Sequence, residues 1–145
     1  MLKFTTVVRV RYADTDKMQF VYNGKYFEYF EVGRTELLRS IGLPYKEIED
    51  KGYQLPLLEA KIIYRNAARY DDLLEIESLV SDLPKPKIHI YYKIKRQSTS
   101  EIIAEGYTVH IFMKADTKKA VRPPQFYIDA LLPYIELNDE IPERN

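Results

Sequence analysis

The chain has 145 residues, of which 46% are hydrophobic and 30% charged, a composition typical of one globular domain with an ordinary core. Lysine plus arginine and aspartate plus glutamate both number 22, so a net charge of zero gives no overall field that would attract nucleic acid. Cysteine is absent, which excludes disulfides and thiolate nucleophiles, and the apolar runs are far shorter than the ~20 residues of a membrane-spanning helix. We therefore expect a single domain, residues 1–145, with no nucleic-acid partner, no membrane span and, without an N-terminal signal pattern, a cytoplasmic location.

The first predicted element is a strand over residues 4–12, where apolar and polar side chains mostly alternate. A polar run with turn-forming residues at 13–19 predicts a loop. From about residue 23 to 40, apolar side chains recur at helical spacing, which predicts a long helix that stops at Gly42. Gly33 lies within the apolar stripe of this helix, so we expect the helix axis to approach a sheet closely there.

Shorter elements follow the long helix. Pro44 and the residues after it predict a short helix that stops at Gly52. Residues 58–64, 73–80, 87–96 and 101–114 are rich in β-branched and aromatic residues and predict four strands. A terminal helix is predicted within about residues 123–133, with its end near Pro133, and residues 134–145 are expected to fray. This order favours an α+β fold, in which an antiparallel sheet of about five strands wraps around one long central helix.

Several separated motifs share one resemblance. Residues 9–16 (RVRYADTD), 21–31 (VYNGKYFEYFE) and 34–36 (RTE) resemble the signature of the 4-hydroxybenzoyl-CoA thioesterase family, which includes the Tol–Pal-associated acyl-CoA thioesterases. Residues 64–72 (YRNAARYDD) and 122–124 (RPP) resemble further parts of the family pattern, so the likeness covers about residues 5–133. It implies a hotdog fold, self-association as a homodimer or homotetramer, an active site at the subunit interface and an acyl-CoA substrate.

Hydrolysis of a thioester needs an attacking oxygen and a donor for the negative charge that develops on the carbonyl oxygen. Asp16 is the candidate for the first role, either by direct attack or as a base that activates water, and the sequence leaves both open. The resemblance implies that the backbone amide of Asn23, at the start of the long helix, fills the second role, and Tyr22 is a further catalytic candidate. The structural alternative for Asp16 is a turn-capping or helix-capping role, and Asp14 is expected to brace the loop.

Two positions depart from the family pattern. Gln19 stands where relatives commonly carry glycine, which bears on backbone freedom or on room beside the substrate. Asn23 stands where some relatives have histidine, so an imidazole acid or base is not available there, while the backbone amide remains.

The resemblance also indicates where the substrate would bind. Lys85 and Lys87 occupy the stretch where similar thioesterases place a basic cluster, which would contact the coenzyme A phosphates, and the alternative is a solvated turn. Arg65 and Arg69 are further candidates for this role. The acyl group would bind in an apolar pocket lined by Tyr26, Leu55, Leu57 and Leu58, with Gln19 beside them. The alternative is that each of the four apolar side chains is an ordinary core residue. No metal and no organic cofactor is expected, since coenzyme A is part of the substrate.

Three other functions were considered. A hotdog dehydratase would use a histidine with a carboxylate, but His89 and His110 lie in predicted strands, away from the loop and the helix start. A non-catalytic acyl-CoA or lipid-binding protein is the main alternative, and Gln19 favours it. A role in protein interaction also stays possible, because a fold does not determine a function.

Overall fold

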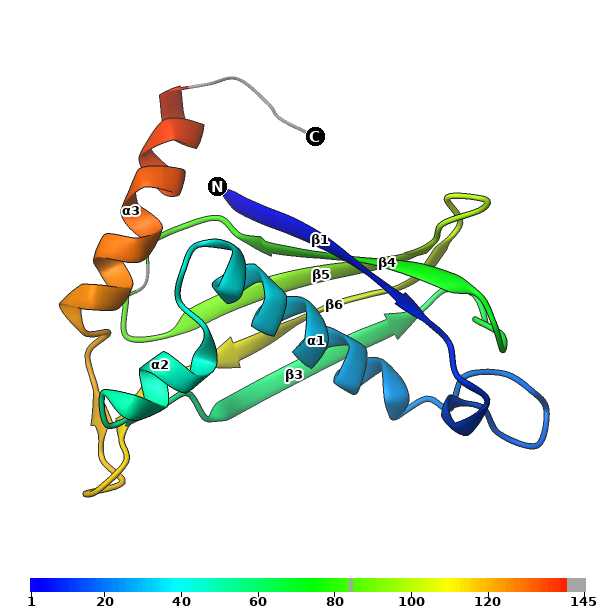
Figure 1. Ribbon diagram of the computed structural model, residues 1–145, viewed down its shortest axis with the longest axis horizontal. Helices are drawn as coiled ribbons and strands as arrows, with labels where there is room; N and C mark the ends of the chain where they lie inside the picture. Colours follow the sequence, from blue (N-terminus) through cyan, green and yellow to red (C-terminus); the bar gives the residue numbers. More distant parts are fainter. Residues whose placement is uncertain (84, 141–145) are drawn as a thin grey trace.

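The computed structural model describes residues 1–83 and 85–140. In this part of the chain a five-stranded antiparallel sheet, in the order β1-β4-β5-β6-β3, curves around the helix α1 (Figure 1). The bounds are Leu2–Arg9 for β1, Leu57–Tyr64 for β3, Leu73–Val80 for β4, Ile88–Arg96 for β5, Ile102–His110 for β6 and Lys25–Ser40 for α1. The predicted arrangement, an antiparallel sheet of five strands around one long helix, is confirmed.

Smaller elements complete the described chain. They are the 3₁₀ helix η1 (Tyr12–Asp14), the helices α2 (Tyr45–Asp50) and α3 (Gln125–Glu140), and the short strands β2 (Tyr53–Gln54), β7 (Phe112–Lys114) and β8 (Ala120–Val121), which pair in a second sheet. The predicted strand over 101–114 is two strands, because the chain leaves β3 and β5 after His110 and then pairs with β2. Strands of two residues show no alternation, so β2 and β8 were not predicted.

The first strand and the first helix are both shorter than predicted. β1 ends at Arg9, and Tyr12 belongs to η1 instead of the strand. The Val10 amide still donates to the Asp72 carbonyl at 2.8 Å, in register with β4, but the Val10 carbonyl accepts from the Asp71 amide at 3.0 Å, so the regular pairing ends there. α1 begins at Lys25, with Gly24 as the residue before its first turn.

The terminal helix is longer than predicted. α3 continues through Pro133 to Glu140, so the predicted end near Pro133 is wrong. The fraying expected beyond residue 133 stays a prediction. Tyr127, Leu131 and Ile135 lie one turn apart and are all buried, so continuing the helix places Ile135 in the core. This burial offsets the hydrogen bond that proline cannot donate. The predicted tail at 141–145 lies outside the described residues.

The core lies between α1 and the concave face of the sheet. Phe30 of α1 stacks on Tyr92 of β5, with 4.2 Å between ring centroids and 7° between ring planes. Gly33 faces β4 so closely that a Cβ atom there would lie 2.7 Å from the Ile76 Cγ2 atom. The close approach expected at Gly33 is therefore confirmed.

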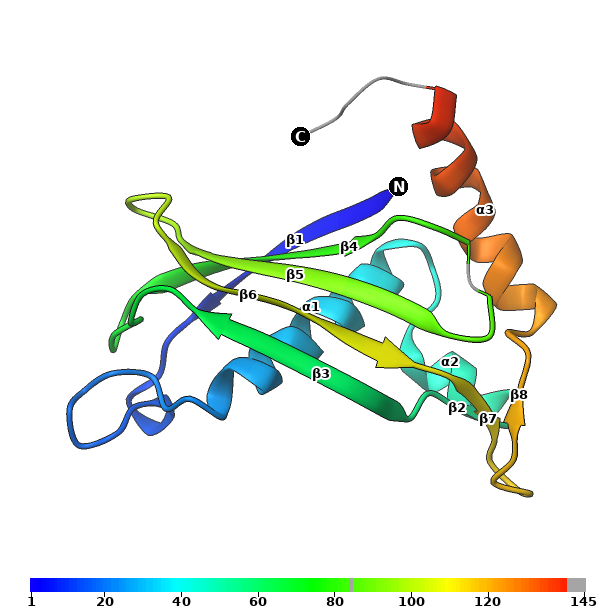
Figure 2. The same ribbon diagram turned by 180° about the vertical axis from the view of Figure 1, so that it is seen from behind.

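The molecule is elongated, and different segments gather at the two ends of its long axis (Figures 1 and 2). The Asp16 end consists of residues 10–24, the β3–β4 turn (65–72) and the β5–β6 turn (97–101). The α3 end consists of α2, α3 and the described residues of the β4–β5 loop (81–83 and 85–87). α1 runs from the Asp16 end to the α3 end. Among the described residues, no helix has both the length and the apolar character that crossing a bilayer requires.

Candidate active site

Asp16 lies in a tight ribbon formed by residues 14–22. Thr15 and Val21 form an antiparallel bridge, and the Asp16 amide donates to the Phe20 carbonyl at 2.9 Å. The Asp16 Oδ1 atom accepts from the Met18 amide at 2.8 Å, so the side chain caps the turn, as the structural alternative predicted. The side chain is exposed, and its Oδ2 atom accepts no hydrogen bond within residues 1–83 and 85–140. One carboxylate oxygen therefore holds the turn while the other is available to a ligand.

Gln19 completes this turn in an unusual backbone conformation. Its φ is 68°, in the left-handed region that glycine adopts without steric cost. A side chain there costs about 1–2 kcal/mol. The departure from the family's glycine therefore keeps the turn and adds strain to it.

The start of α1 presents unpaired amide groups. Within the described chain, the backbone amides of Asn23 and Gly24 donate to no acceptor. The Asn23 carbonyl accepts a hydrogen bond from the Tyr64 hydroxyl at 3.0 Å, which ties the helix start to the end of β3. Tyr22 is exposed, and its ring lies over Gly24. Because the helix dipole points its positive end here, the free Asn23 amide suits a bound oxygen that carries negative charge.

Asp14 anchors the ribbon to α1, as expected. It is buried and accepts hydrogen bonds from the Arg11 amide at 3.0 Å, the Arg11 guanidinium at 3.1 Å and the Tyr29 hydroxyl at 3.0 Å, and it pairs with Lys25 at 3.2 Å. Burial by itself would raise the pKa of Asp14, but the hydrogen bonds, led by those from Arg11, lower it below its ordinary value. Burial and the charge of Asp14 raise the pKa of Tyr29, so this hydroxyl stays protonated and donates.

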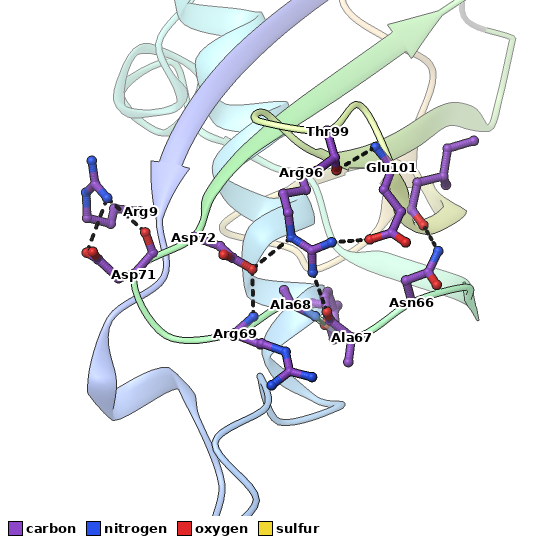
Figure 3. A network of polar contacts seen from close by, with 12 residues as sticks. Arg9, Asn66, Ala67, Ala68, Arg69, Asp71, Asp72, Arg96, Thr99 and Glu101 are labelled. Carbon is purple, nitrogen blue, oxygen red and sulfur yellow. Dashed lines mark hydrogen bonds and ion pairs between the residues drawn. The ribbon is translucent and has the colours of Figure 1, made fainter.

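The β3–β4 turn is held by Arg96 of β5 (Figure 3). The Arg96 guanidinium donates to the Asp72 carboxylate at 3.1 Å, to the Ala67 carbonyl at 2.6 Å and to the Glu101 carboxylate. The Asp72 carboxylate also accepts from the Arg69 amide at 2.9 Å. Sequence analysis missed Arg96, because its partners come from two turns far apart in the chain; the acidic pair at residues 71 and 72 was the one local signal.

The turn also packs against the Asp16 ribbon. The Val21 amide donates to the Ala68 carbonyl at 2.9 Å, and the Arg69 guanidinium lies 4.7 Å from the centroid of the Phe20 ring. Arg65 pairs with Glu105 at 3.1 Å. Both arginines considered for coenzyme A therefore lie at the Asp16 end, already in contact with neighbouring side chains.

The lysines considered for the coenzyme A phosphates lie at the α3 end. Lys85 and Lys87 are exposed and line a groove of about 550 Å³ beside His89 and Tyr91. Within one chain, the β4–β5 loop that carries them lies at the opposite end of the sheet from the segment between β1 and α1, which carries Asp16 (Figures 1 and 2). A single chain therefore does not gather these lysines and Asp16 around one substrate.

The candidates for the acyl pocket divide into two groups. Leu57 and Leu58 are half exposed on β3, an edge strand of the sheet, so their side chains are accessible. Tyr26 is only 2% exposed, and its hydroxyl accepts a hydrogen bond from the Ala68 amide at 3.3 Å. Its ring packs in the core against the rings of Tyr29 and Tyr64, and its place in an acyl pocket stays a prediction.

Neither histidine lies near Asp16. His89 is exposed on β5, and His110 is buried at the end of β6, where its Nε2 atom lies 2.9 Å from the Thr108 hydroxyl. Within residues 1–83 and 85–140, no three side chains of histidine, aspartate or glutamate gather in a way that would hold a metal ion. The Asp16 end presents an exposed carboxylate and, before the start of α1, unpaired backbone amides.

Comparison with known proteins gives consistent matches. The sequence profile of a family described as the Thioesterase-like superfamily matches residues 10–131. YneP of Bacillus subtilis is 30% identical over 119 residues, which cover 82% of this chain and 83% of that protein. The acyl-CoA thioesterase YbgC of Haemophilus influenzae is 33% identical over 96 residues, which cover 66% of this chain and 71% of that protein. Among solved structures, a DHNA-CoA thioesterase from Staphylococcus aureus matches with a TM-score of 0.89 and 27% identity, over 97% of this chain and 95% of that one.

Proposed function

Because the chain belongs to the Thioesterase-like superfamily, as the resemblance predicted, and has the hotdog fold, we propose that it hydrolyses an acyl-CoA to a free acid and coenzyme A. The relative YbgC, named an acyl-CoA thioesterase, supports this substrate class. The observation that carries the proposal is the exposed carboxylate of Asp16, with one unpaired oxygen, on the ribbon that leads into the unpaired Asn23 amide. These are the two groups that thioester hydrolysis requires.

In the proposed reaction, Asp16 either supplies the attacking oxygen or activates the water molecule that supplies it. Either its carboxylate adds to the thioester carbonyl, releases the coenzyme A thiolate and forms an anhydride that water then cleaves, or it takes a proton from a water molecule that attacks directly. In both cases the carbonyl oxygen becomes negatively charged and accepts a hydrogen bond from the Asn23 amide, which the helix dipole reinforces. The reaction as proposed uses no metal and no organic cofactor.

Exposed apolar side chains gather at the Asp16 end, which indicates that a ligand or another protein covers them. Tyr12, Met18, Tyr22 and Tyr70 are each more than half exposed, and the rings of Tyr12 and Tyr70 pack edge to face with 5.8 Å between centroids. Large apolar side chains gathered on a surface mark a place where a ligand or another protein binds. In the proposed enzyme they are covered by the acyl-CoA and by a second copy of the chain.

We infer that the second copy pairs along β3. This strand is at the edge of the sheet, and Leu57, Leu58, Ile63 and Tyr64 on it are exposed, which an isolated edge strand normally avoids. Two β3 strands related by a two-fold axis run antiparallel. The α3 end of one copy then lies toward the Asp16 end of the other, which brings the two lysines of its β4–β5 loop toward the substrate. The working unit is therefore a homodimer, or a tetramer built from it.

The test is release of free thiol from a panel of short, medium-chain and aromatic acyl-CoAs, with the variant Asp16→Asn. Asparagine keeps the oxygen that accepts from the Met18 amide and removes the charge, so the turn persists while the rate falls by about 100-fold or more. The matched control is Asp116→Asn, since Asp116 is exposed and its Oδ1 atom accepts from the Thr117 amide at 2.7 Å in a distant turn.

Two outcomes would overturn the proposal. One is no thiol release from any acyl-CoA in the panel, and the other is an unchanged rate for Asp16→Asn. Binding of acyl-CoA without turnover would instead favour the non-catalytic binding protein.

A further inference from the structure

A second cavity, of about 390 Å³, lies toward the α3 end of the fold, between α1, β5, β6 and α3. Most of its wall is apolar or aromatic: Leu38, Tyr45, Leu55, Ile88, Ile90 and Tyr127. Its polar lining comes from Glu31, Arg34, Thr35 and His110. An apolar wall with a few polar groups, at this volume, is typical of a pocket for a small organic molecule.

A chain of buried polar groups leads to this cavity. The Tyr92 hydroxyl lies 2.7 Å from the Thr108 hydroxyl, and the Thr108 hydroxyl lies 2.9 Å from the His110 Nε2 atom. The His110 Nδ1 atom faces the Leu55 carbonyl at 3.4 Å. Together with Ser78 and Asp14, Thr108 and His110 make up the buried polar residues of the described chain. Burying polar groups costs free energy that apolar packing would avoid, so their concentration beside one cavity indicates a use for the cavity.

His110 contributes hydrogen bonds to this chain and no charge. Burial, and then the positive charge of Arg34, lower the pKa of His110 to about 4, so the ring is neutral near pH 7. A neutral imidazole donates from one nitrogen and accepts at the other. The Nδ1 hydrogen then points to the Leu55 carbonyl, Nε2 accepts from Thr108, and Thr108 accepts from Tyr92. With these partners satisfied, the positive charge of the cavity resides on Arg34.

The Arg34 guanidinium has N–H groups available to a ligand in the cavity. Its side chain is 22% exposed, and its ion pair with Glu31 spans 3.8 Å to a carboxylate that is 69% exposed, so the pair is weak. Burial raises the pKa of Tyr92, and the positive charge of Arg34 partly opposes this effect, so the guanidinium also lies near the Tyr92 hydroxyl. A guanidinium carries five N–H groups, so donors remain for a group in the cavity.

We propose that this cavity binds a small monocarboxylate with an apolar body, whose carboxylate contacts the Arg34 guanidinium and whose body lies against the apolar wall. Planar carboxylates match the guanidinium geometry and can accept two parallel hydrogen bonds. A doubly charged phosphate is a poorer fit, because one cation faces it and Glu31 lines the same cavity. Within one chain the cavity is separate from the Asp16 end, since Arg34 lies about 16 Å from Asn23 in the direction of the α1 axis.

The test is isothermal titration calorimetry of the 145-residue protein with hexanoate and benzoate, and with their neutral counterparts 1-hexanol and benzyl alcohol. We expect at least one of the acids to bind once per chain, with its neutral counterpart at least tenfold weaker. Arg34→Gln weakens binding of that acid at least tenfold, whereas Glu31→Gln strengthens it about threefold by removing the competing carboxylate. The control Arg39→Gln breaks the corresponding pair with Glu36, one turn along the helix, and leaves binding unchanged.

The histidine ring signals in NMR spectra locate the bound acid. Binding in the cavity shifts the signals of His110, which lines it, and leaves those of His89, which lines the neighbouring groove, in place. The proposal fails if neither acid binds, if Arg34→Gln binds as tightly as the unchanged protein, or if only the His89 signals move. Glu31 is exposed, so Glu31→Gln keeps the fold and remains informative even if Arg34→Gln is unstable. None of these measurements depends on hydrolysis of a thioester.

Discussion

Gly33 of α1 and Ser78 of β4 approach so closely that a Cβ atom on Gly33 would lie 2.5 Å from the Ser78 Oγ atom. Ser78 is fully buried, and within the described chain its hydroxyl has no hydrogen-bond partner. This contact sets how close α1 lies to the sheet. The position of α1 in turn places the Asn23 amide, just before its first turn, and Arg34, the residue that follows Gly33.

Gly33→Ala is expected to destabilise the protein by about 1–3 kcal/mol, because the added methyl group clashes with β4. The better helix propensity of alanine, worth about 1 kcal/mol, does not offset this clash. Equilibrium unfolding in urea measures the change. Removing the unpaired hydroxyl with Ser78→Ala serves as the control and should cost little or nothing. Equal stability of Gly33→Ala and the unchanged protein would show that the helix has room to move away from β4.

Gln19→Gly is expected to stabilise the protein by up to about 1 kcal/mol, since glycine adopts the positive φ at this position without steric cost. Gln19→Ala, which keeps the strain, should leave stability unchanged. Urea unfolding measures both variants, and thiol release from acyl-CoA shows whether the glutamine side chain affects turnover. A loss of stability in Gln19→Gly would mean that contacts of the glutamine side chain outweigh the backbone strain.

Asp14→Asn is expected to destabilise the protein by about 2–3 kcal/mol, because Arg11 and Lys25 lose a buried anionic partner. The lowered pKa of Asp14 stabilises the folded state above the unfolded value near 3.8, and this stabilisation is lost as pH falls through the folded pKa. Urea unfolding at pH 7 measures the change. The control is Asp71→Asn, whose exposed pair with Arg9 should contribute less than about 1 kcal/mol. Similar losses for the two variants would argue against an anchoring role for Asp14.

Stability is expected to fall by about 3 kcal/mol as pH falls from about 6.5 to about 4, because of His110. In this window the unfolded chain binds a proton on the imidazole that the folded protein, with its lowered pKa, does not bind. Above the window neither state binds the proton, so the slope vanishes there. His110→Gln keeps a hydrogen-bonding side chain and should lose this dependence between pH 7 and 5, whereas His89→Gln should keep it. Urea unfolding at several pH values compares them, and an unchanged slope in His110→Gln would assign the effect to other groups.

Short-range patterns in the sequence determined the main elements and the family. Alternation over eight or nine residues is enough to place β4 and β5, and the helical stripe around Phe30 is enough to place α1, because both signals depend on neighbours within one or two turns of the chain. The motif around Asp16 likewise lies within one stretch of sequence, so it indicated both the family and the catalytic candidates.

Only the tertiary structure decided which side chains meet. Arg96 forms hydrogen bonds with two turns, and Tyr26 is covered by a strand that begins more than 30 residues later. Ile135 is buried in the core, and α3 continues beyond Pro133 to place it there. The same holds for the cavity, where Arg34 of α1 faces His110 at the end of β6. Such contacts depend on how the sheet curves around α1 and therefore on the packing of the whole core, which no local pattern of residues encodes.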